Sequence, residues 1–148
     1  MRRATAAARG ERGQALIEAA LTIPLLLLIA VGIFEFGRAY QTWQILTNAA
    51  REGARLAVVP SPGPGTVEAR VRLYMQDGQL SEFASAAVTV NSSDSLTVNG
   101  KTISASRVTI DYPFNFIVLR PVARLINRST TLGAPLTMRA TALMRNEM

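Results

Sequence analysis

The sequence predicts an α+β fold in which one long N-terminal helix packs on a small antiparallel β-sheet. A helical pattern runs from Gln14 to about Val59 and begins with a strongly apolar segment. From Ala86 onward the hydrophobic period changes to two, which is typical of strands with one solvent-facing side. Asn99-Gly100 lies between two β-prone runs and predicts a hairpin turn.

The first half of the predicted helix is apolar enough to cross a membrane. No charged residue occurs from Ala19 to Phe34, and Glu18 is the one charge between Gln14 and that segment. A spanning helix needs roughly 17–25 mostly apolar residues. No small-residue cleavage pattern follows the run, so a secretory signal is disfavoured. We therefore expect residues 14–36 to form a retained transmembrane segment.

The flanks of this segment predict its orientation. Residues 1–13 are small and basic, with four arginines, and are expected to be a leader without regular structure. Basic residues beside a span stay on the cytoplasmic side, so the N-terminus is predicted to be cytoplasmic. Residues 37–59 would then continue the helix outside the cytoplasm, and residues 60–148 would form an extracytoplasmic α+β domain.

Turn signals divide the C-terminal part into short elements. After the Pro- and Gly-rich segment 60–65, a second helix is predicted from Thr66, as its N-cap, to Asp77, with Gly78 at its C-cap. The later elements are expected at 86–90, 96–103, 106–112 and 136–144 as strands, and at 121–127 as a short helix. The apolar cluster 114–119 is predicted to be core; a patch for a partner or the membrane is the alternative.

The long helix carries three further features. Pro24 predicts a kink, because proline cannot donate the helical hydrogen bond. Tyr40 and Trp43 fit either the outer headgroup region or the start of the core, and the sequence leaves this open. A row of small residues is predicted to pack closely on the domain's own sheet, with a neighbouring subunit's helix as the less favoured partner. These residues are Ala49, Ala50, Gly53, Ala54 and Ala57.

Glu18 is the unusual ionisable residue, since a carboxylate inside a lipid-facing helix costs roughly 2.5–3.5 kcal/mol. It could lie near the interface and pair with Arg12 or water. Alternatively, cleavage after Gly13 would leave a positive amine on Gln14, and Glu18 of one subunit could neutralise the amine of its neighbour. Glu35 and Arg38 are also spaced to form an ion pair on one helix face.

The composition argues against an enzyme. The chain has no histidine to activate its hydroxyls and no cysteine, so triads, disulfides and the usual zinc and iron ligand sets are lacking. The acidic residues do not show a calcium-loop spacing, and no phosphate loop is present. The net charge of +6 is spread along the chain, which does not favour nucleic acid. We expect no catalytic residue, metal, cofactor or small-molecule substrate.

Four segments resemble the TadE-like family, the minor pilin or pseudopilin proteins of the tight-adherence (Flp-type) pilus system. They are RGQALIEAALTIPLLLL, IFEFGRAY, NAAREGARLA and the ending YPFNF…LTMRATALMRNE. The resemblance implies a pilin-like fold and a leader cut by a prepilin peptidase between Gly13 and Gln14, with Glu18 as the carboxylate five residues after the glycine. It also implies other pilins and an inner-membrane assembly platform as partners, and a role in pilus assembly or adhesion.

Two functional hypotheses follow. In the first, the chain is a minor pilin or pseudopilin that is processed after Gly13 and is anchored in the bacterial inner membrane or built into a pilus. In the second, it is an unprocessed single-span anchor that presents an extracytoplasmic protein-binding domain. The N-terminal residue of the mature chain discriminates between them.

Overall fold

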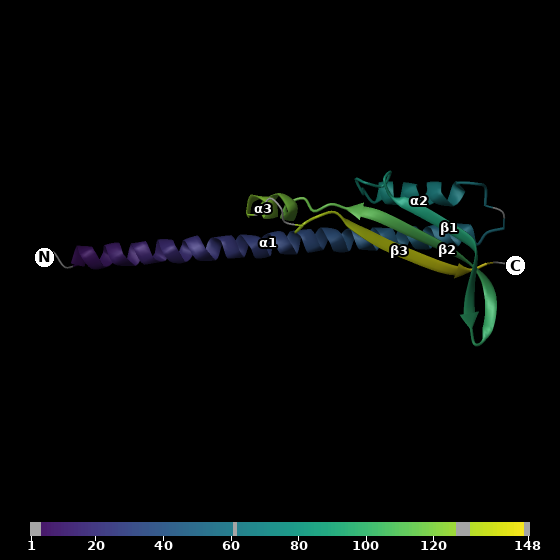
Figure 1. Ribbon diagram of the computed structural model, residues 1–148, viewed down its shortest axis with the longest axis horizontal. Helices are drawn as coiled ribbons and strands as arrows, with labels where there is room; N and C mark the ends of the chain where they lie inside the picture. Colours follow the sequence, from purple (N-terminus) through teal and green to yellow (C-terminus); the bar gives the residue numbers. More distant parts are fainter. Residues whose placement is uncertain (1–3, 61, 127–130, 147–148) are drawn as a thin grey trace.

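A computed structural model describes residues 4–60, 62–126 and 131–146. The described elements follow the order α1 (Ala4–Ala57), α2 (Thr66–Asp77), β1 (Ala87–Val98), β2 (Lys101–Phe114), α3 (Leu119–Ile126) and β3 (Leu136–Arg145). The C-terminal half of α1 packs on the domain, and the N-terminal half projects from it as a bare rod (Figure 1). The predicted α+β architecture is confirmed.

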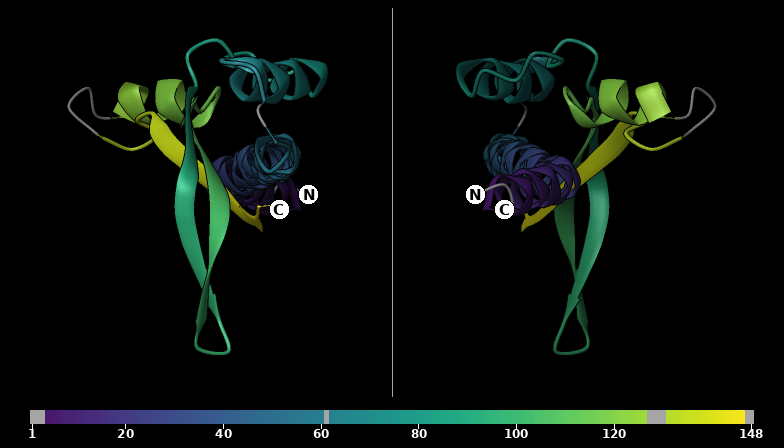
Figure 2. Two further views of the ribbon diagram at one scale, coloured as in Figure 1. Left: turned by 90° about the vertical axis from the view of Figure 1, so that its right-hand side faces the viewer. Right: turned by 90° about the vertical axis from the view of Figure 1, so that its left-hand side faces the viewer.

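Within the described residues, the strands form an antiparallel sheet in the order β1-β2-β3. Asn99 and Gly100 join β1 to β2 with φ of 51° and 75°, as a two-residue hairpin turn with two positive φ angles requires. A bulge between Asn91 and Asp94 shifts the register, so the predicted separate strands are continuous through this irregularity. The tip of the hairpin extends past α1 on the side away from α2 (Figure 2).

The core lies where α1 meets α2 and the sheet. The small-residue row of α1 is buried there, and it packs on α2 as well as on the sheet that the sequence predicted. A Cβ on Gly53 would lie 2.5 Å from Val71 Cγ2 of α2 and 3.3 Å from Val108 Cγ1 of β2. The row therefore lets α1 approach both a helix and a strand of its own fold, and a neighbour's helix has no access to it.

The bounds of α2 and its C-cap are as predicted, but its N-cap is not. Gly65, with φ of 75°, takes the N-cap position without a side-chain hydrogen bond, so Thr66 is the first helical residue and not the cap. Gly78 is the C-cap with an ordinary φ of −73°, and Gln79 takes the left-handed conformation at φ of 59°. Gly78 is needed for space, because a Cβ there would lie 2.7 Å from Ile45 Cγ2.

The course of α1 corrects the expectation for the leader. The helix begins at Ala4, so the prediction that residues 1–13 lack regular structure is wrong for residues 4–13. Nothing in these residues needs burial, and the helix simply continues toward the N-terminus. α1 runs through Pro24 without a break, and the kink there stays a prediction.

The apolar residues near the end of the projecting rod are divided between core and surface. Phe114 is fully buried, as predicted, but Ile117 is 58% exposed, so the core prediction is wrong for that residue. Tyr40 and Trp43 are 65% and 45% exposed, so they do not begin the core. Their position in the headgroup region stays a prediction.

Candidate anchoring and assembly site

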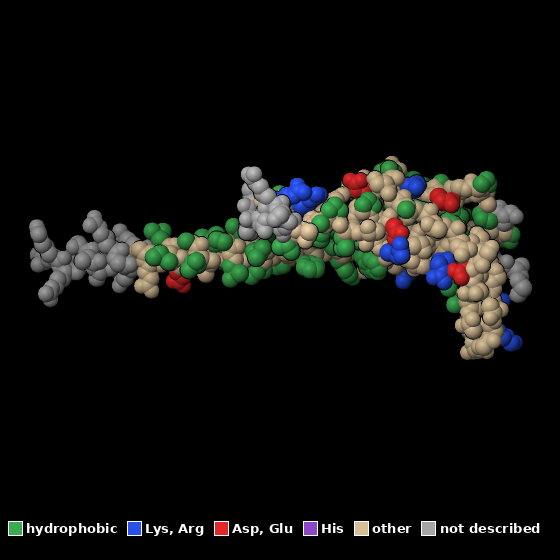
Figure 3. Space-filling view, viewed as in Figure 1, with side chains coloured by type: hydrophobic (Ala, Val, Ile, Leu, Met, Phe, Trp, Pro, Cys, Tyr) green, Lys and Arg blue, Asp and Glu red, His purple; other side chains and the backbone are tan. Residues whose placement is uncertain are grey.

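The projecting part of α1 is an apolar surface that no other element covers over most of its length. Among the described residues, Gly13–Ala57 contains the helix long and apolar enough to cross a membrane, and none of its most apolar stretch is buried. Leucine and isoleucine side chains from Leu16 to Ile33 are more than half exposed. Figure 3 shows this band of apolar side chains along the rod. An exposed surface of this kind indicates a membrane-anchored protein.

The predicted processing residues lie on this rod. Gly13, Gln14 and Glu18 are all exposed, and a Cβ added at Gly13 would meet no atom within 4 Å. Gln14 and Glu18 are four residues apart, so they share one helix face. The alternative pairing of Glu18 with Arg12 involves a side chain outside those described. The geometry leaves Glu18 accessible to a second molecule.

A second carboxylate, Glu35, lies at the other end of the apolar run and is 2% exposed. Its Oε1 accepts hydrogen bonds from the backbone N–H groups of Val118 at 2.6 Å and Leu119 at 3.2 Å. Its Oε2 accepts one from Arg38 Nη1 at 2.9 Å, which confirms the predicted ion pair. Leu119 is the first residue of α3, so Glu35 of α1 satisfies backbone donors at the N-terminus of another helix. This carboxylate therefore fixes α3 to α1.

Arg38 extends the same junction. Its guanidinium lies 5.1 Å from the centroid of the Phe114 ring, and its Nη1 and Nη2 lie 3.4 and 3.5 Å from the carbonyl oxygen of Asn115. Phe114 in turn packs edge-to-face against Phe116 at a centroid distance of 5.2 Å. The end of β2 is thereby held against the part of α1 that leaves the apolar segment.

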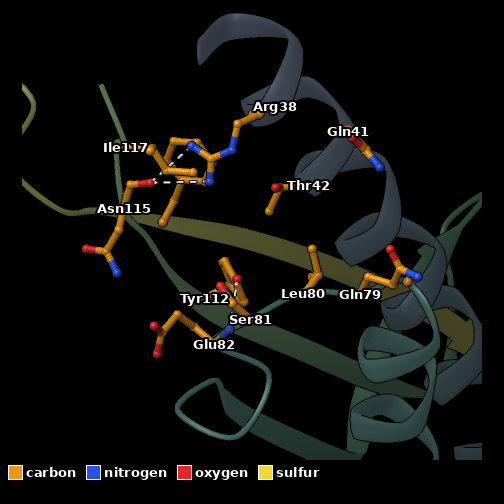
Figure 4. Close-up of a pocket in the computed structure, with 12 residues that line it drawn as sticks. Arg38, Gln41, Thr42, Gln79, Leu80, Ser81, Glu82, Tyr112, Asn115 and Ile117 are labelled. Carbon is orange, nitrogen blue, oxygen red and sulfur yellow. Dashed lines mark hydrogen bonds between the residues drawn. The ribbon is translucent and has the colours of Figure 1, made fainter. Parts of the chain in front are cut away.

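Arg38 also borders a polar cleft of about 240 Å³ between α1, the turn after α2 and the end of β2 (Figure 4). The hydroxyl of Tyr112 accepts a hydrogen bond from the backbone N–H of Glu82 at 3.2 Å in this cleft. Ser85 Oγ donates to the Glu82 carboxylate at 3.1 Å. Because Arg38, Tyr112 and Glu82 all have partners in the fold, they hold the cleft together.

An apolar groove lies on the other side of the junction, between α3 and the apolar part of α1. It has a volume of about 660 Å³. Its lining consists of Pro24, Leu25, Leu27, Leu28, Val31 and Val122. Five of these residues belong to the predicted membrane segment, and Val122 belongs to α3. The short helix of the domain therefore lies beside the outer end of the apolar rod (Figure 1).

In two ion pairs on the outer face of the sheet, the arginine lowers the pKa of the carboxyl group that it contacts. The Arg139 guanidinium donates to both carboxylate oxygens of Asp111, at 2.6 and 2.8 Å, and lowers the pKa of that carboxyl. The hydrogen bond from Arg107, joined by one from the backbone N–H of Ser95, lowers the pKa of Asp94. Both pairs join neighbouring strands of the sheet.

The sequence predicted only part of this junction between α1 and α3. The i,i+3 spacing of Glu35 and Arg38 predicted their ion pair, but not that Glu35 accepts from a segment 83 residues later. A charged residue directly after a long apolar run is the one local signal, because such a carboxylate needs partners near the membrane boundary. Among the described residues, no cluster of His, Cys, Asp or Glu could hold a metal ion.

Comparison with known proteins bears on this region. Residues 13–55 match the family model described as TadE-like protein. The resemblance predicted from the sequence is thus confirmed over the segment that holds the apolar rod, Glu35 and the small-residue row up to Ala54. It indicates a protein associated with a Tad pilus system. No curated protein and no solved structure matches the chain.

Proposed function

We propose that the chain is a minor pilin or pseudopilin that takes part in assembling a Flp-type (tight-adherence) pilus. In this proposal a prepilin peptidase cuts after Gly13, and α1 anchors the subunit in the bacterial inner membrane with its domain outside the cytoplasm. The observation that carries the proposal is that the TadE-like match begins at Gly13 and contains the entire uncovered apolar rod.

The exposure of Glu18 supports a role in assembly. A carboxylate in a lipid-facing helix needs a partner, and Glu18 is exposed on the rod while Glu35 is satisfied within its own chain. After cleavage, the new amine of Gln14 would be positive near the same membrane level. Glu18 of one subunit and the amine of the next would neutralise each other when two rods pack side by side, which favours ordered stacking.

The remaining fold fits an assembly subunit better than an enzyme. The cleft beside Arg38 is bounded by groups that already have partners, and the chain contains no histidine or cysteine to act as base or nucleophile. We therefore propose protein partners, namely other pilins, the prepilin peptidase and the inner-membrane assembly platform. The proposal includes no small-molecule substrate, cofactor or nucleic acid.

Mass spectrometry of the chain recovered from cells with an active prepilin peptidase tests the processing step. We expect the loss of residues 1–13 in the wild type and the intact chain in Gly13→Ala. Gly32→Ala is the matched control, because both glycines lie in α1 with no atom within 4 Å of an added Cβ. An intact N-terminus in cells that assemble pili normally would refute the proposal and favour the unprocessed single-span anchor.

The role of Glu18 is tested separately from folding. Glu18→Ala should abolish recruitment into pili while the unfolding transition of the domain stays at its wild-type position, because Glu18 lies on the exposed rod. Glu68→Ala, a carboxylate change in α2, should leave recruitment intact. Normal recruitment of the Glu18 variant would show that the carboxylate is not an assembly contact.

A further inference from the structure

We propose that α3 docks on anionic phospholipid at the membrane surface on the domain's side, with lipid acyl chains filling the groove between α3 and α1. This inference rests on the membrane anchoring of α1 and not on processing or on a pilus. The position of the groove, the residues that line it and the charges beside it all favour anionic phospholipid as its occupant.

The position of the groove places it within a membrane. Counted from Gln14 at about 1.5 Å per residue, a hydrocarbon core about 30 Å thick ends near Ile33. Val31 then lies about 3 Å and Leu25 about 12 Å inside this boundary. Both residues line the groove together with Val122 of α3. A span of the expected length therefore brings α3 to the membrane surface or slightly below it.

The composition of α3 fits this position. Leu119, Val122 and Ala123 face the fold or the groove, and Ala123 is buried. Arg120 and Arg124 are four residues apart and share another face, with Arg124 exposed. An amphipathic helix with arginines beside an apolar face is typical of helices that lie in the membrane interface. The long arginine side chains can reach the headgroups while their aliphatic parts stay against apolar surface.

The apolar surface continues beyond α3 itself. Ile117 is 58%, Leu132 67% and Leu136 50% exposed, and all three lie in segments that flank α3. Figure 3 shows basic side chains over this end of the domain, next to the apolar band of the rod. Exposed apolar side chains with a basic rim, continuous with a membrane-spanning helix, match an anionic lipid surface better than water.

The fold holds α3 rigidly in this position. Glu35 accepts the backbone N–H groups of Val118 and Leu119 and so ties the start of α3 to the end of the apolar rod. Gly133, with φ of 72°, lies against the backbone of Arg120 in α3: a Cβ added to this glycine would be 2.7 Å from the Arg120 Cα. The segment before β3 therefore packs directly on α3, while the Glu35 hydrogen bonds fix the position of α3 along α1.

Single cysteines test the proposal cleanly, because the chain has no cysteine of its own. The full chain would carry Val122→Cys, labelled with a fluorophore that a water-soluble quencher reaches, in vesicles of phosphatidylcholine with or without phosphatidylglycerol. Thr97→Cys, exposed on the β1–β2 hairpin, is the matched site away from the proposed surface. We expect quenching at position 122 to be roughly threefold or more weaker than at position 97 in the phosphatidylglycerol vesicles.

The charge contribution has its own paired variants. Arg120→Gln with Arg124→Gln should remove the extra protection that phosphatidylglycerol gives at position 122. Arg51→Gln with Arg55→Gln, which neutralises two exposed arginines at the same spacing on α1, should leave that protection unchanged. Circular dichroism of each labelled chain confirms that the fold is retained.

Three results would overturn the proposal. Equal quenching at positions 122 and 97 would show that α3 lies in water. Protection of the wild type that does not rise when phosphatidylglycerol is added, or that the double Arg variant keeps in full, would exclude anionic lipid as the occupant. Protection that disappears when the protein is diluted in lipid would assign the groove to a second copy of the chain. A protected label in the vesicles, together with an intact N-terminus in cells that have an active prepilin peptidase and assemble pili normally, would refute the processing proposal and support this one.

Discussion

The Glu35 junction gives the sharpest stability prediction. Glu35→Gln keeps the size of the side chain and one carbonyl oxygen that can still accept from Val118 or Leu119. Its amide nitrogen cannot accept from Arg38, so the charge-assisted hydrogen bond of 2.9 Å between the two side chains is lost. We expect the variant to unfold more readily and α3 to detach from α1 first.

The magnitude follows from the burial of the two partners. A hydrogen bond to a charged group contributes about 1.5–3 kcal/mol, and breaking a fully buried ion pair costs about 3–5 kcal/mol. The Glu35 side chain is 3% exposed but that of Arg38 is 29% exposed, so water can still solvate the released guanidinium. A loss of about 2–3 kcal/mol in the free energy of unfolding is therefore expected.

Glu52→Gln is the matched control, because it makes the same change on the same helix. Glu52 pairs with Arg70 at 3.0 Å, with side-chain exposures of 31% and 48%, and such surface pairs contribute about 0–1 kcal/mol. Denaturant unfolding of the full chain in detergent micelles measures both changes. Hydrogen exchange should show faster exchange of the α3 amides in the Glu35 variant alone. Equal destabilisation by the two variants, or unchanged exchange in α3, would refute the junction argument.

Three further predictions concern the rest of the fold. Gly53→Ala places a Cβ 2.5 Å from the buried Val71 side chain and should lower the free energy of unfolding, measured by thermal unfolding, by about 1–3 kcal/mol. Gly37→Ala, where an added Cβ meets no atom, should raise it by up to about 1 kcal/mol. A change of the same sign in both variants would contradict the packing. Gly100→Ala, at φ of 75°, should speed amide exchange at the hairpin tip without changing exchange in α2. Asp111 has a lowered pKa because Arg139 donates to its carboxylate, so its stabilisation is present above about pH 3.9 and is lost as the pH falls through its lower folded value. Urea unfolding across this acid range should show a shallower pH dependence in Asp111→Asn than in the wild type, and parallel curves would argue against the pair.

The elements that the sequence predicted well depend on local patterns. The bounds of α2 follow from a Pro- and Gly-rich turn and one apolar face, and the hairpin follows from Asn99-Gly100, whose two positive φ angles few other residues tolerate. Gly78 is the C-cap of α2 as predicted, but the sequence did not show that glycine is needed there to leave space for the Ile45 side chain and not to adopt a positive φ. Local rules place glycine where φ is positive, and they do not account for tertiary contacts that need space.

The candidate site shows the same division. The accessible rod with Gly13, Gln14 and Glu18 was readable, because length, apolarity and flanking charge are all local properties of the sequence. The attachment of α3 was not, since the contact between Glu35 and Val118 joins residues 83 positions apart and nothing in either segment specifies the other. Ile117 was placed in the core for a related reason, because an apolar cluster looks the same whether the fold or a membrane covers it.

The two acids that flank the apolar run have different environments, and this separates anchoring from assembly. A carboxylate left without a partner in lipid costs roughly 2.5–3.5 kcal/mol, so each of them needs a partner. Glu35 has its partners inside the chain, and binding a neighbour would require it to release α3 and Arg38. Glu18 is exposed, so under the proposed function it can pair with a neighbour's amine at no cost to the fold. Changes at Glu35 should therefore alter how the domain sits on the membrane, whereas changes at Glu18 should alter only whether subunits join.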